Sequence, residues 1–318
     1  MSAATGVPVV ALGGGHGLAA SLSALRRVTQ DLTAVVTVAD DGGSSGRLRS
    51  EFGVLPPGDL RQALAALCDD DDWGRTWARV LQHRFRSGGE LHGHAVGNLL
   101  IAALWQLLDE HVAGLDWVAR LLGAQGRVLP MSAVPLDILA QVTGLDPAQP
   151  DRVDVVRGQV EVATTPGTVR SVALDPVDPP ACAEAVQAVR DASYVVLGPG
   201  SWFTSVIPHL LVPELSRALH ASPAKRIVTL NLAPQPGETA GLSPDAHLDA
   251  LAAHAPDLGI DMVLADRGSA GDVDRLTATT KSLGAELVVA DVAAADGSPR
   301  HDPGRLAEAY AEIFADRR

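Results

Sequence analysis

The chain has 318 residues, of which 47% are hydrophobic, so it can bury a large core without help from metals or disulfides. Its formal net charge of -13 argues against a surface that binds nucleic acid, because such a surface needs an excess of Lys and Arg. The two cysteines, Cys68 and Cys182, lie far apart in the sequence, which is typical of free buried thiols in a reducing cytoplasm.

The N-terminal residues and the apolar run 95–108 do not have the pattern of exported or membrane-spanning segments. Residues 1–6 lack a basic stretch followed by an apolar one. The run 95–108 is too short for a span and contains Asn98 and Gln106. We therefore expect a cytoplasmic protein without a membrane span.

Short runs rich in Val, Ile and Leu alternate with helix-like stretches in both the first and the last third of the chain. The runs do not alternate strictly between apolar and polar residues, which is typical of parallel strands buried on both faces. The expected strands are 7–12, 33–39, 194–197, 226–230, 261–264 and 286–289. The expected helices are 17–29, 179–190, 209–220, 244–253, 272–281 and 303–315. This order predicts an α/β fold with a doubly wound, Rossmann-like parallel sheet.

The middle third breaks this alternation. Four consecutive amphipathic helices are expected at 59–68, 73–84, 92–108 and 114–124. Residues 127–173 then read as short strands with turns at Gly144, Gly158 and Gly167, which predicts a small antiparallel β element. Trp73, Trp77 and Phe85 recur at roughly helical spacing and are expected in the core. We expect one domain, 1–318, whose core (about 1–58 and 174–318) carries a helical and β insertion (about 59–173).

The first strand is followed by a glycine-rich loop that then opens a helix. Glycines let the backbone approach a phosphate, and a helix N-terminus offers free N–H groups. The loop also fits a loose dinucleotide fingerprint with Asp40 as the ribose-reading acid, so an NAD-binding enzyme is an alternative, and a tightly packed turn is another. The candidate ligand residues here are Gly14, Gly15, His16 and Gly17.

The second loop places carboxylates, flexible N–H donors and arginines within a few residues. Such a set can hold a sugar hydroxyl, or Mg²⁺ beside a nucleotide diphosphate, with guanidinium groups on the phosphate oxygens. The alternative is a turn that begins the next helix, with solvated arginines. The candidate residues are Asp40, Asp41, Gly43, Ser44, Ser45 and Arg47. We expect Asp41 to contact a ligand or Mg²⁺.

Four later segments add candidates at expected strand ends and helix starts. Asn98 falls inside an apolar helix, where its amide either binds a ligand or bridges two core loops, and Asn231 has the same two interpretations. The turn after residue 197 can receive a diphosphate on its N–H groups and hydroxyls, or be a plain turn. These candidates are Asp59, Arg61, His94, Asn98, Gly198, Pro199, Gly200, Ser201, Thr204 and Asn231.

The sequence offers little for metal-dependent or nucleophilic catalysis. His83, His92 and His94 lack further ligands at zinc spacing, and no Ser lies in a Gly-x-Ser-x-Gly elbow. If chemistry occurs, Asp40, Asp41 and Asp59 are the candidate metal or acid/base groups.

Taken together, these strings resemble the CofD-like (2-phospho-L-lactate transferase) superfamily and, within it, the YvcK-type gluconeogenesis factors. The resemblance covers nearly the whole chain. It is carried by the first glycine loop and by Thr37 to Arg49, Pro57-Gly58-Asp59-Leu60-Arg61, Gly93-His94 with Gly97-Asn98-Leu99, Gly198-Pro199-Gly200-Ser201 with Thr204-Ser205, and Gln235-Pro236-Gly237-Glu238-Thr239. The chain departs from the branch pattern at His16, where Thr is usual.

The resemblance implies a cytoplasmic protein that binds UDP-sugars, UDP-N-acetylglucosamine above all, and supports cell shape and wall synthesis during gluconeogenic growth. In the family's pattern an arginine before the last helix, here Arg300, reaches the ligand; the alternative is an exposed Arg before a helix cap. A ligand-binding regulator and a phosphotransfer enzyme of the 2-phospho-L-lactate transferase type both remain open. We also expect a homo-oligomer.

Overall fold

The computed structural model describes residues 5–235, 237–239 and 241–315. The extreme N-terminus, where no export segment was expected, and Pro236 of the family string lie outside the described residues. In the part of the chain that is described, no helix is both long and apolar enough to cross a bilayer.

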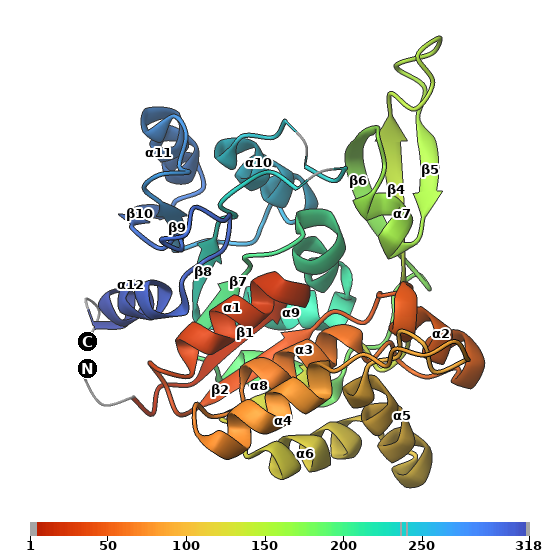
Figure 1. The fold of residues 1–318 in the computed structure, drawn as a ribbon. Helices are drawn as coiled ribbons and strands as arrows, with labels where there is room; N and C mark the ends of the chain where they lie inside the picture. The colour runs from red at the N-terminus through yellow and green to blue at the C-terminus, as the bar shows by residue number, and fades with distance from the viewer. Residues whose placement is uncertain (1–4, 236, 240, 316–318) are drawn as a thin grey trace.

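Seven strands form one parallel sheet, in the order β10-β9-β8-β7-β1-β2-β3 (Figure 1). The strands are β1 (Val9–Gly13), β2 (Leu32–Val36), β3 (Arg127–Pro130), β7 (Tyr194–Leu197), β8 (Lys225–Thr229), β9 (Met262–Asp266) and β10 (Glu286–Ala290). β1 is an interior strand, because Val10 pairs with Thr33 of β2 on one side and with Val195 of β7 on the other. The predicted doubly wound α/β fold is confirmed.

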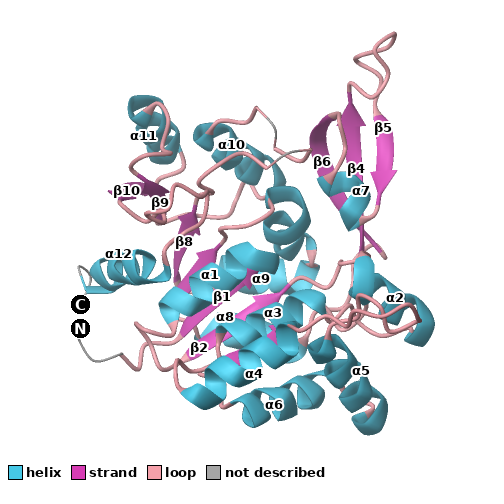
Figure 2. Ribbon diagram, in the orientation of Figure 1, coloured by secondary structure: helices cyan, strands magenta, loops and turns pink. Residues whose placement is uncertain are grey.

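The central strands are buried along their whole length, which explains their unbroken apolar sequences. Every residue of β1, β7 and β9 is buried. Helices cover both faces of the sheet, so neither side of these strands meets water. α1 packs on α3 and α12 on one face, whereas α8 and α9 pack together on the other (Figure 2).

The helices that connect and flank the strands follow the predicted order, with small differences at their ends. They are α1 (Gly15–Leu25), α2 (Gly43–Phe52), α3 (Gly58–Ala66), α4 (Asp72–Gln82), α5 (Val96–Leu108), α6 (His111–Leu122), α7 (Gln159–Ala163), α8 (Ala183–Asp191), α9 (Pro213–Ala221), α10 (Pro244–His254), α11 (Val273–Ser282) and α12 (Pro303–Ala315). A π-helical turn (Trp202–Val206) and a 3₁₀ turn (Ile207–Leu211) precede α9.

The small antiparallel element projects from one end of the main sheet (Figure 1). It consists of β4 (Asp137–Thr143), β5 (Asp154–Arg157) and β6 (Thr168–Asp175), in the order β5-β4-β6. The expectation for 127–173 is right for these strands and wrong for 127–130. Those residues are β3 and pair in parallel with β2, at the edge of the main sheet.

The second loop has the form of its alternative interpretation, a turn that begins the next helix. Residues 43–52 form helix α2, for which Gly42 supplies an extended N-cap, and Gly53 ends the helix in the left-handed region. One further expectation is wrong. Trp73 was expected in the core but is 54% exposed, whereas Trp77 is partly buried against the core. The spacing of apolar residues shows that they share one side of a helix, but it does not show how much of that side a neighbouring helix covers.

Candidate functional site

The strand order reverses between β1 and β7, so the loops after these strands flank a crevice at the carboxyl edge of the sheet. From β1 the chain moves outward through β2 to β3, and from β7 it moves the other way through β8 and β9 to β10. In open α/β sheets, ligands bind at such a switch point. The predicted loops 13–18 and 198–201 both lie there.

The loops after β1 and β7 touch, and glycine is required where they meet. A Cβ added at Gly17 would lie 2.3 Å from the Pro199 carbonyl oxygen, so no larger residue fits. Asn231 fixes the other side of the contact: its Oδ1 accepts from the Gly200 N–H and its Nδ2 donates to the Gly200 carbonyl, both at 2.8 Å. Asn231 therefore bridges two loops, one of its two predicted interpretations.

Two carboxylates lie under the first glycine loop. A Cβ at Gly14 would lie 2.5 Å from Asp59 Oδ2 and 3.2 Å from Ser205 Oγ, and one at Gly58 would lie 2.5 Å from Asp40 Oδ2. At Gly14 and Gly58 the backbone thus packs so closely against a carboxylate that a larger residue would collide with it. The sequence-predicted acids of the second and third loops are brought together around the first loop.

The charge of this cluster is unbalanced. Burial raises the pKa of Asp59 to about 7, with a further contribution from the negative charge of Asp40, while the Gly15 N–H and Arg61 act in the opposite direction. Burial also lowers the pKa of Arg61 to about 10. At neutral pH the Asp59 carboxyl is therefore close to half ionised, unlike an ordinary aspartate.

A buried hydrogen-bond network holds Arg61 in place. Arg61 Nε donates to Asn98 Oδ1 at 2.8 Å, and Asn98 Nδ2 donates to Ser44 Oγ at 3.1 Å. Ser44 Oγ also lies 3.0 Å from His94 Nδ1, and Ser45 Oγ lies 3.4 Å from Asn98 Nδ2. Asn98 thus bridges two core segments. Arg61 is only 3% exposed, yet its Nη1 has no hydrogen-bond partner within the described residues.

The helices that begin at the carboxyl ends of β1 and β2 have glycine N-caps, Gly14 and Gly42, which bring no capping side chain, and neither helix has an acidic residue in its first turn. The first N–H of α1, that of Gly15, is hydrogen-bonded to the Asp59 carboxylate. By contrast, side chains cap α4, α6 and α11. An uncapped N-terminus offers N–H groups and the positive end of the helix dipole to an anion.

Glu238 accepts hydrogen bonds from groups that we expected to bind a diphosphate. Its Oε1 accepts from the N–H groups of Phe203 at 2.6 Å and Thr204 at 2.8 Å, and its Oε2 accepts from the Ser201 hydroxyl, which also contacts Thr204 Oγ1. Glu238 is 4% exposed, and burial raises its pKa. Glu238 stands in one of the family strings, but no local signal in the sequence indicates this role. The anion at residues 201–204 is supplied by the chain itself.

Some predicted residues point elsewhere. Both oxygens of Asp41 accept from the N–H groups of α7, at Gln159 (3.0 Å) and Val160 (3.1 Å), so this side chain ties α7 to the second loop. His16 and Gly43 are exposed. Arg300 is exposed in the segment after β10, at the edge of the sheet, and within the described residues its side chain has no hydrogen bond or ion pair with another candidate site residue.

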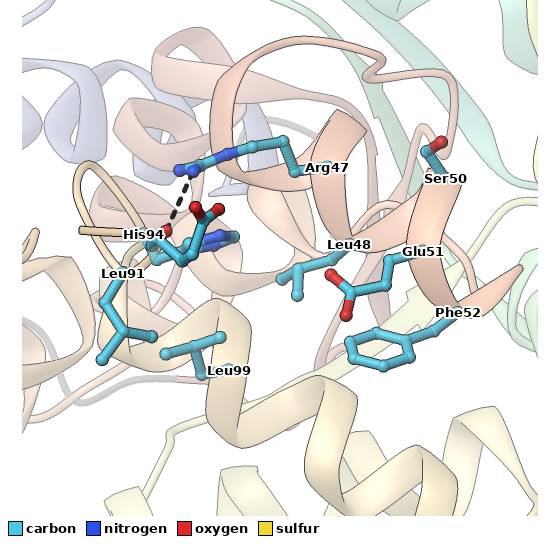
Figure 3. A pocket seen from close by; sticks show the side chains of 9 residues that line it. Arg47, Leu48, Ser50, Glu51, Phe52, Leu91, His94 and Leu99 are labelled. Atoms are coloured by element: carbon cyan, nitrogen blue, oxygen red, sulfur yellow. Dashed lines mark hydrogen bonds between the residues drawn. The ribbon is translucent and has the colours of Figure 1, made fainter.

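Arg47 also faces away from the strand ends. Its guanidinium donates to the carbonyls of Glu90 at 3.2 Å and His92 at 2.8 Å, across a cavity of about 460 Å³ beside α2 (Figure 3). The cavity is lined by the second half of α2, by the segment before α5 and by Leu99. His94 lines it and bonds to Ser44, so it connects the cavity wall to the buried network.

Metal ligands are sparse. In the parts of the chain that the structure describes, no three His, Cys, Asp or Glu side chains are grouped for a metal ion. Asp40 and Asp59 form a pair of carboxylates rather than a complete cage. Mg²⁺ commonly takes one or two carboxylates and completes its shell with phosphate oxygens and water, so this pair fits Mg²⁺ only together with a phosphate ligand.

With this geometry established, comparison with known proteins identifies the family. The family model described as 2-phospho-L-lactate transferase CofD matches residues 9–299. The chain belongs to the CofD family.

Within the CofD family, this member is of the YvcK type. It is 57% identical over 310 residues to a relative from Mycobacterium tuberculosis, covering 96% of this chain and 90% of the relative. It is 35% identical over 260 residues to the gluconeogenesis factor of Bacillus subtilis, covering 81% and 78%. The crystal structure of a UPF0052 family member from Bacillus halodurans superposes with a TM-score of 0.83 at 31% identity, covering 97% and 99%. The predicted family resemblance is confirmed.

Proposed function

We propose that this CofD-family protein binds a UDP-sugar, UDP-N-acetylglucosamine above all, at the crevice between β1 and β7. The observation that carries the proposal is the N-terminus of α1 at this switch point, where the N-cap residue Gly14 has no side chain to cap the N–H groups that follow Gly15. The diphosphate is placed against this helix end. Residues 203 and 204 are a poorer position, because Glu238 already accepts from their N–H groups.

The side chains around this crevice supply the other contacts that a nucleotide sugar needs. Arg61 is buried beside Asp59 with Nη1 unpartnered among the described residues, so a phosphate oxygen would complete its hydrogen bonding. Asp40 and Asp59 offer acceptors for ribose or sugar hydroxyls. We also propose that Arg300 closes the site from the side of β10. For this contact its exposed side chain would have to move toward the bound ligand.

The biological role we propose follows from the relatives. The Bacillus subtilis and Listeria innocua proteins of this branch carry the name gluconeogenesis factor. We infer that UDP-sugar binding makes this chain a cytoplasmic regulatory factor, one that supports cell shape and cell-wall synthesis during growth on gluconeogenic carbon. A regulator needs selective binding at the crevice and no turnover.

A phosphotransfer activity of the 2-phospho-L-lactate transferase type is the second candidate, favoured by the Asp40 and Asp59 pair. The two carboxylates would hold Mg²⁺ against the ligand phosphates, and Mg²⁺ would supply charge neutralisation there. With its pKa raised to about 7 by burial, Asp59 is also suited to moving a proton at neutral pH. An NAD-binding enzyme is a weaker candidate, because only the first loop and Asp40 support it.

Calorimetric titration with UDP-N-acetylglucosamine, GDP and NAD, each with and without Mg²⁺, tests these candidates. We expect micromolar binding of the UDP-sugar, about 8 kcal/mol at 1 μM. Arg61→Ala should weaken it tenfold to a hundredfold, since a charge-assisted hydrogen bond contributes about 1.5–3 kcal/mol. Arg61→Lys, which keeps the charge, should lose less, and Arg190→Ala on the exposed face of α8 should lose nothing.

The result that contradicts the proposal is binding of GDP or NAD in preference to the UDP-sugar. Because Arg61 is buried, the melting temperature of each variant must be recorded beside its affinity. Phosphorus NMR of the UDP-sugar incubated with protein and Mg²⁺ separates the two functions. A new phosphate resonance supports turnover, whereas an unchanged spectrum recorded with an alcohol acceptor present supports a regulator.

A further inference from the structure

An exposed aromatic face lies on the outer side of the helical segment, away from the strand ends. It consists of Trp73 and Trp77 of α4 and of Trp117 and Leu121 of α6, and we call it the tryptophan face. Trp73 is 54% exposed, Trp117 is 52% exposed and Leu121 is 40% exposed. Three of the five tryptophans in the chain are therefore on one surface, although the chain uses few aromatic residues overall.

The members of the tryptophan face are in contact with one another. The Trp73 indole N–H donates to the Leu121 carbonyl at 3.2 Å, and the rings of Trp73 and Trp77 lie 5.6 Å apart. Trp117 is one helical turn before Leu121 on α6. α4 and α6 run side by side at the bottom of the view in Figure 1. Contiguous exposed apolar surface marks interaction sites, and Trp is enriched among residues that dominate binding energy.

The charged side chains beside this face are placed so that those of one copy can pair with opposite charges of a second copy. On α4, Asp72, Thr76 and Arg79 share the outward side, opposite the buried Gly74 and Leu81. The acidic end of the helix thus lies about 10 Å from Arg79, at a rise of 1.5 Å per residue. Arg79 makes no ion pair with any described residue, whereas Asp72 is paired only with its neighbour Arg75, at 2.6 Å.

An antiparallel α4 pair satisfies this arrangement. A two-fold axis near residues 75 and 76 places Asp72 of one copy opposite Arg79 of the other, twice over. The same axis brings Trp73 of each copy toward Trp77 of the other, and it sets the two helix dipoles antiparallel, with the N-terminus of each helix beside the C-terminus of the other. Two-fold dimers are the commonest oligomers, and their contacts are isologous in this way.

We propose that the tryptophan face is the two-fold interface of a homodimer, with α4 packed antiparallel on the α4 of a second copy. The acidic run at 69–72 makes an anionic membrane or a nucleic acid a poor occupant, because like charges would face each other. This interface lies on α4 and α6, which contribute no residue to the proposed ligand crevice. It is therefore independent of the ligand proposal.

The test is sedimentation equilibrium of the full chain over about 1–100 μM, where a dimer of this kind shows a concentration-dependent mass. Arg79→Asp and Asp72→Arg should each weaken dimerisation at least tenfold, because each places like charges opposite one another. The double variant Asp72→Arg/Arg79→Asp restores opposite charges across the two-fold axis and should regain the dimer. Trp117→Ser should weaken the dimer more than either charge reversal.

The matched control is Val155→Ser on β5, which removes an exposed apolar side chain, 68% exposed, from a different surface. Circular dichroism and melting temperature verify that every variant is folded. A monomeric parent at 100 μM overturns the proposal, as does a dimer that survives Trp117→Ser. Failure of the double variant to dimerise, when both single variants have lost the dimer, overturns the antiparallel arrangement. Loss in both single variants with recovery in the double one supports it.

Discussion

Asp59 is the residue whose chemistry depends most on its neighbours. In an isolated chain its carboxyl would be ionised at neutral pH, but here it is packed under Gly14 with a second carboxylate, Asp40, close by. Arg61 offsets only part of this unfavourable charge, because burial lowers its own pKa as well. Such perturbed groups cluster at functional sites, because acids, bases and ligand contacts there need pKa values matched to their task.

The pH dependence of stability follows from this placement. The folded pKa of Asp59, about 7, lies above the value of 3.8 that an aspartate has in an unfolded chain, so the folded protein holds more protons than the unfolded one between these values. The free energy of unfolding should therefore fall as pH rises through this window. Asp59→Asn removes the charge, so at about pH 8 it should be more stable than the parent by roughly 1–3 kcal/mol, and at about pH 4 nearly equal.

Urea unfolding of Asp59→Asn and of the parent at both pH values, in the presence of a chelator, measures this difference. Asp151→Asn, at an exposed position, is the control for loss of a carboxylate. Equal stability of Asp59→Asn and the parent at the higher pH would show that solvent, rather than burial, sets the ionisation of this group. Added Mg²⁺ should narrow the difference if the carboxylate pair holds a metal with phosphate.

At the scale of elements, the site depends on how closely α1 approaches the loop after β7. Gly17 lies in the first turn of α1 and contacts the backbone of Pro199 and Gly200. This close approach holds the two strand-end loops together at the switch point. Asn231, from the loop after β8, clamps the same backbone with two hydrogen bonds.

Gly17→Ala should therefore separate these loops. The added methyl would lie 2.3 Å from the Pro199 carbonyl oxygen. A backbone atom cannot move aside as easily as the end of a flexible side chain. We expect a loss of about 1–3 kcal/mol of stability, typical of overpacking, together with loss of UDP-sugar binding. Thermal unfolding with and without ligand measures both effects. Gly88→Ala, at a position with nothing within 4 Å, is the matched control, and equal behaviour of the two variants would contradict the close approach.

At the scale of the whole molecule, one hydrophobic core joins the parallel sheet to the antiparallel element. Buried residues of β4 and β6, such as Ile138 and Val172, belong to the same cluster as Val10 of β1 and Ile227 of β8. β6 also packs against the 3₁₀ turn at 207–211. We propose on this basis that residues 1–318 fold as a single domain, as the sequence analysis expected.

A single domain predicts one cooperative unfolding transition. Differential scanning calorimetry should give a calorimetric enthalpy equal to the van't Hoff enthalpy, because no part of the core can melt while the rest stays packed. Two resolved transitions, or a van't Hoff enthalpy well below the calorimetric one, would instead divide the chain into separate folding units. The experiment is best done below 1 μM or with Trp117→Ser, so that dimer dissociation does not add a second step.

Much of this architecture was predictable because its signals are local. The unbroken apolar runs of β1 and β7 predict buried parallel strands, and the glycine loops at their ends predict an edge where backbone lies open to a ligand. The family strings are local as well, so the CofD family was identifiable from them, and the matching family model confirms it. These features depend on residues that are adjacent in the chain, and the conformation of such residues is largely determined by their immediate neighbours.

The remaining features depend on contacts between distant segments, which only the tertiary structure decides. The apolar pattern at 127–130 predicts a strand but not the strand with which it pairs. In the structure this strand pairs with β2 and therefore belongs to the parallel sheet. Asp41 meets α7 and Glu238 meets residues 201–204 only because the fold brings these segments together. Local sequence patterns are thus sufficient for most of the elements, for the glycine loops and for the family. The tertiary structure decided which polar groups already have partners, because a hydrogen bond formed within the fold removes that group from ligand binding.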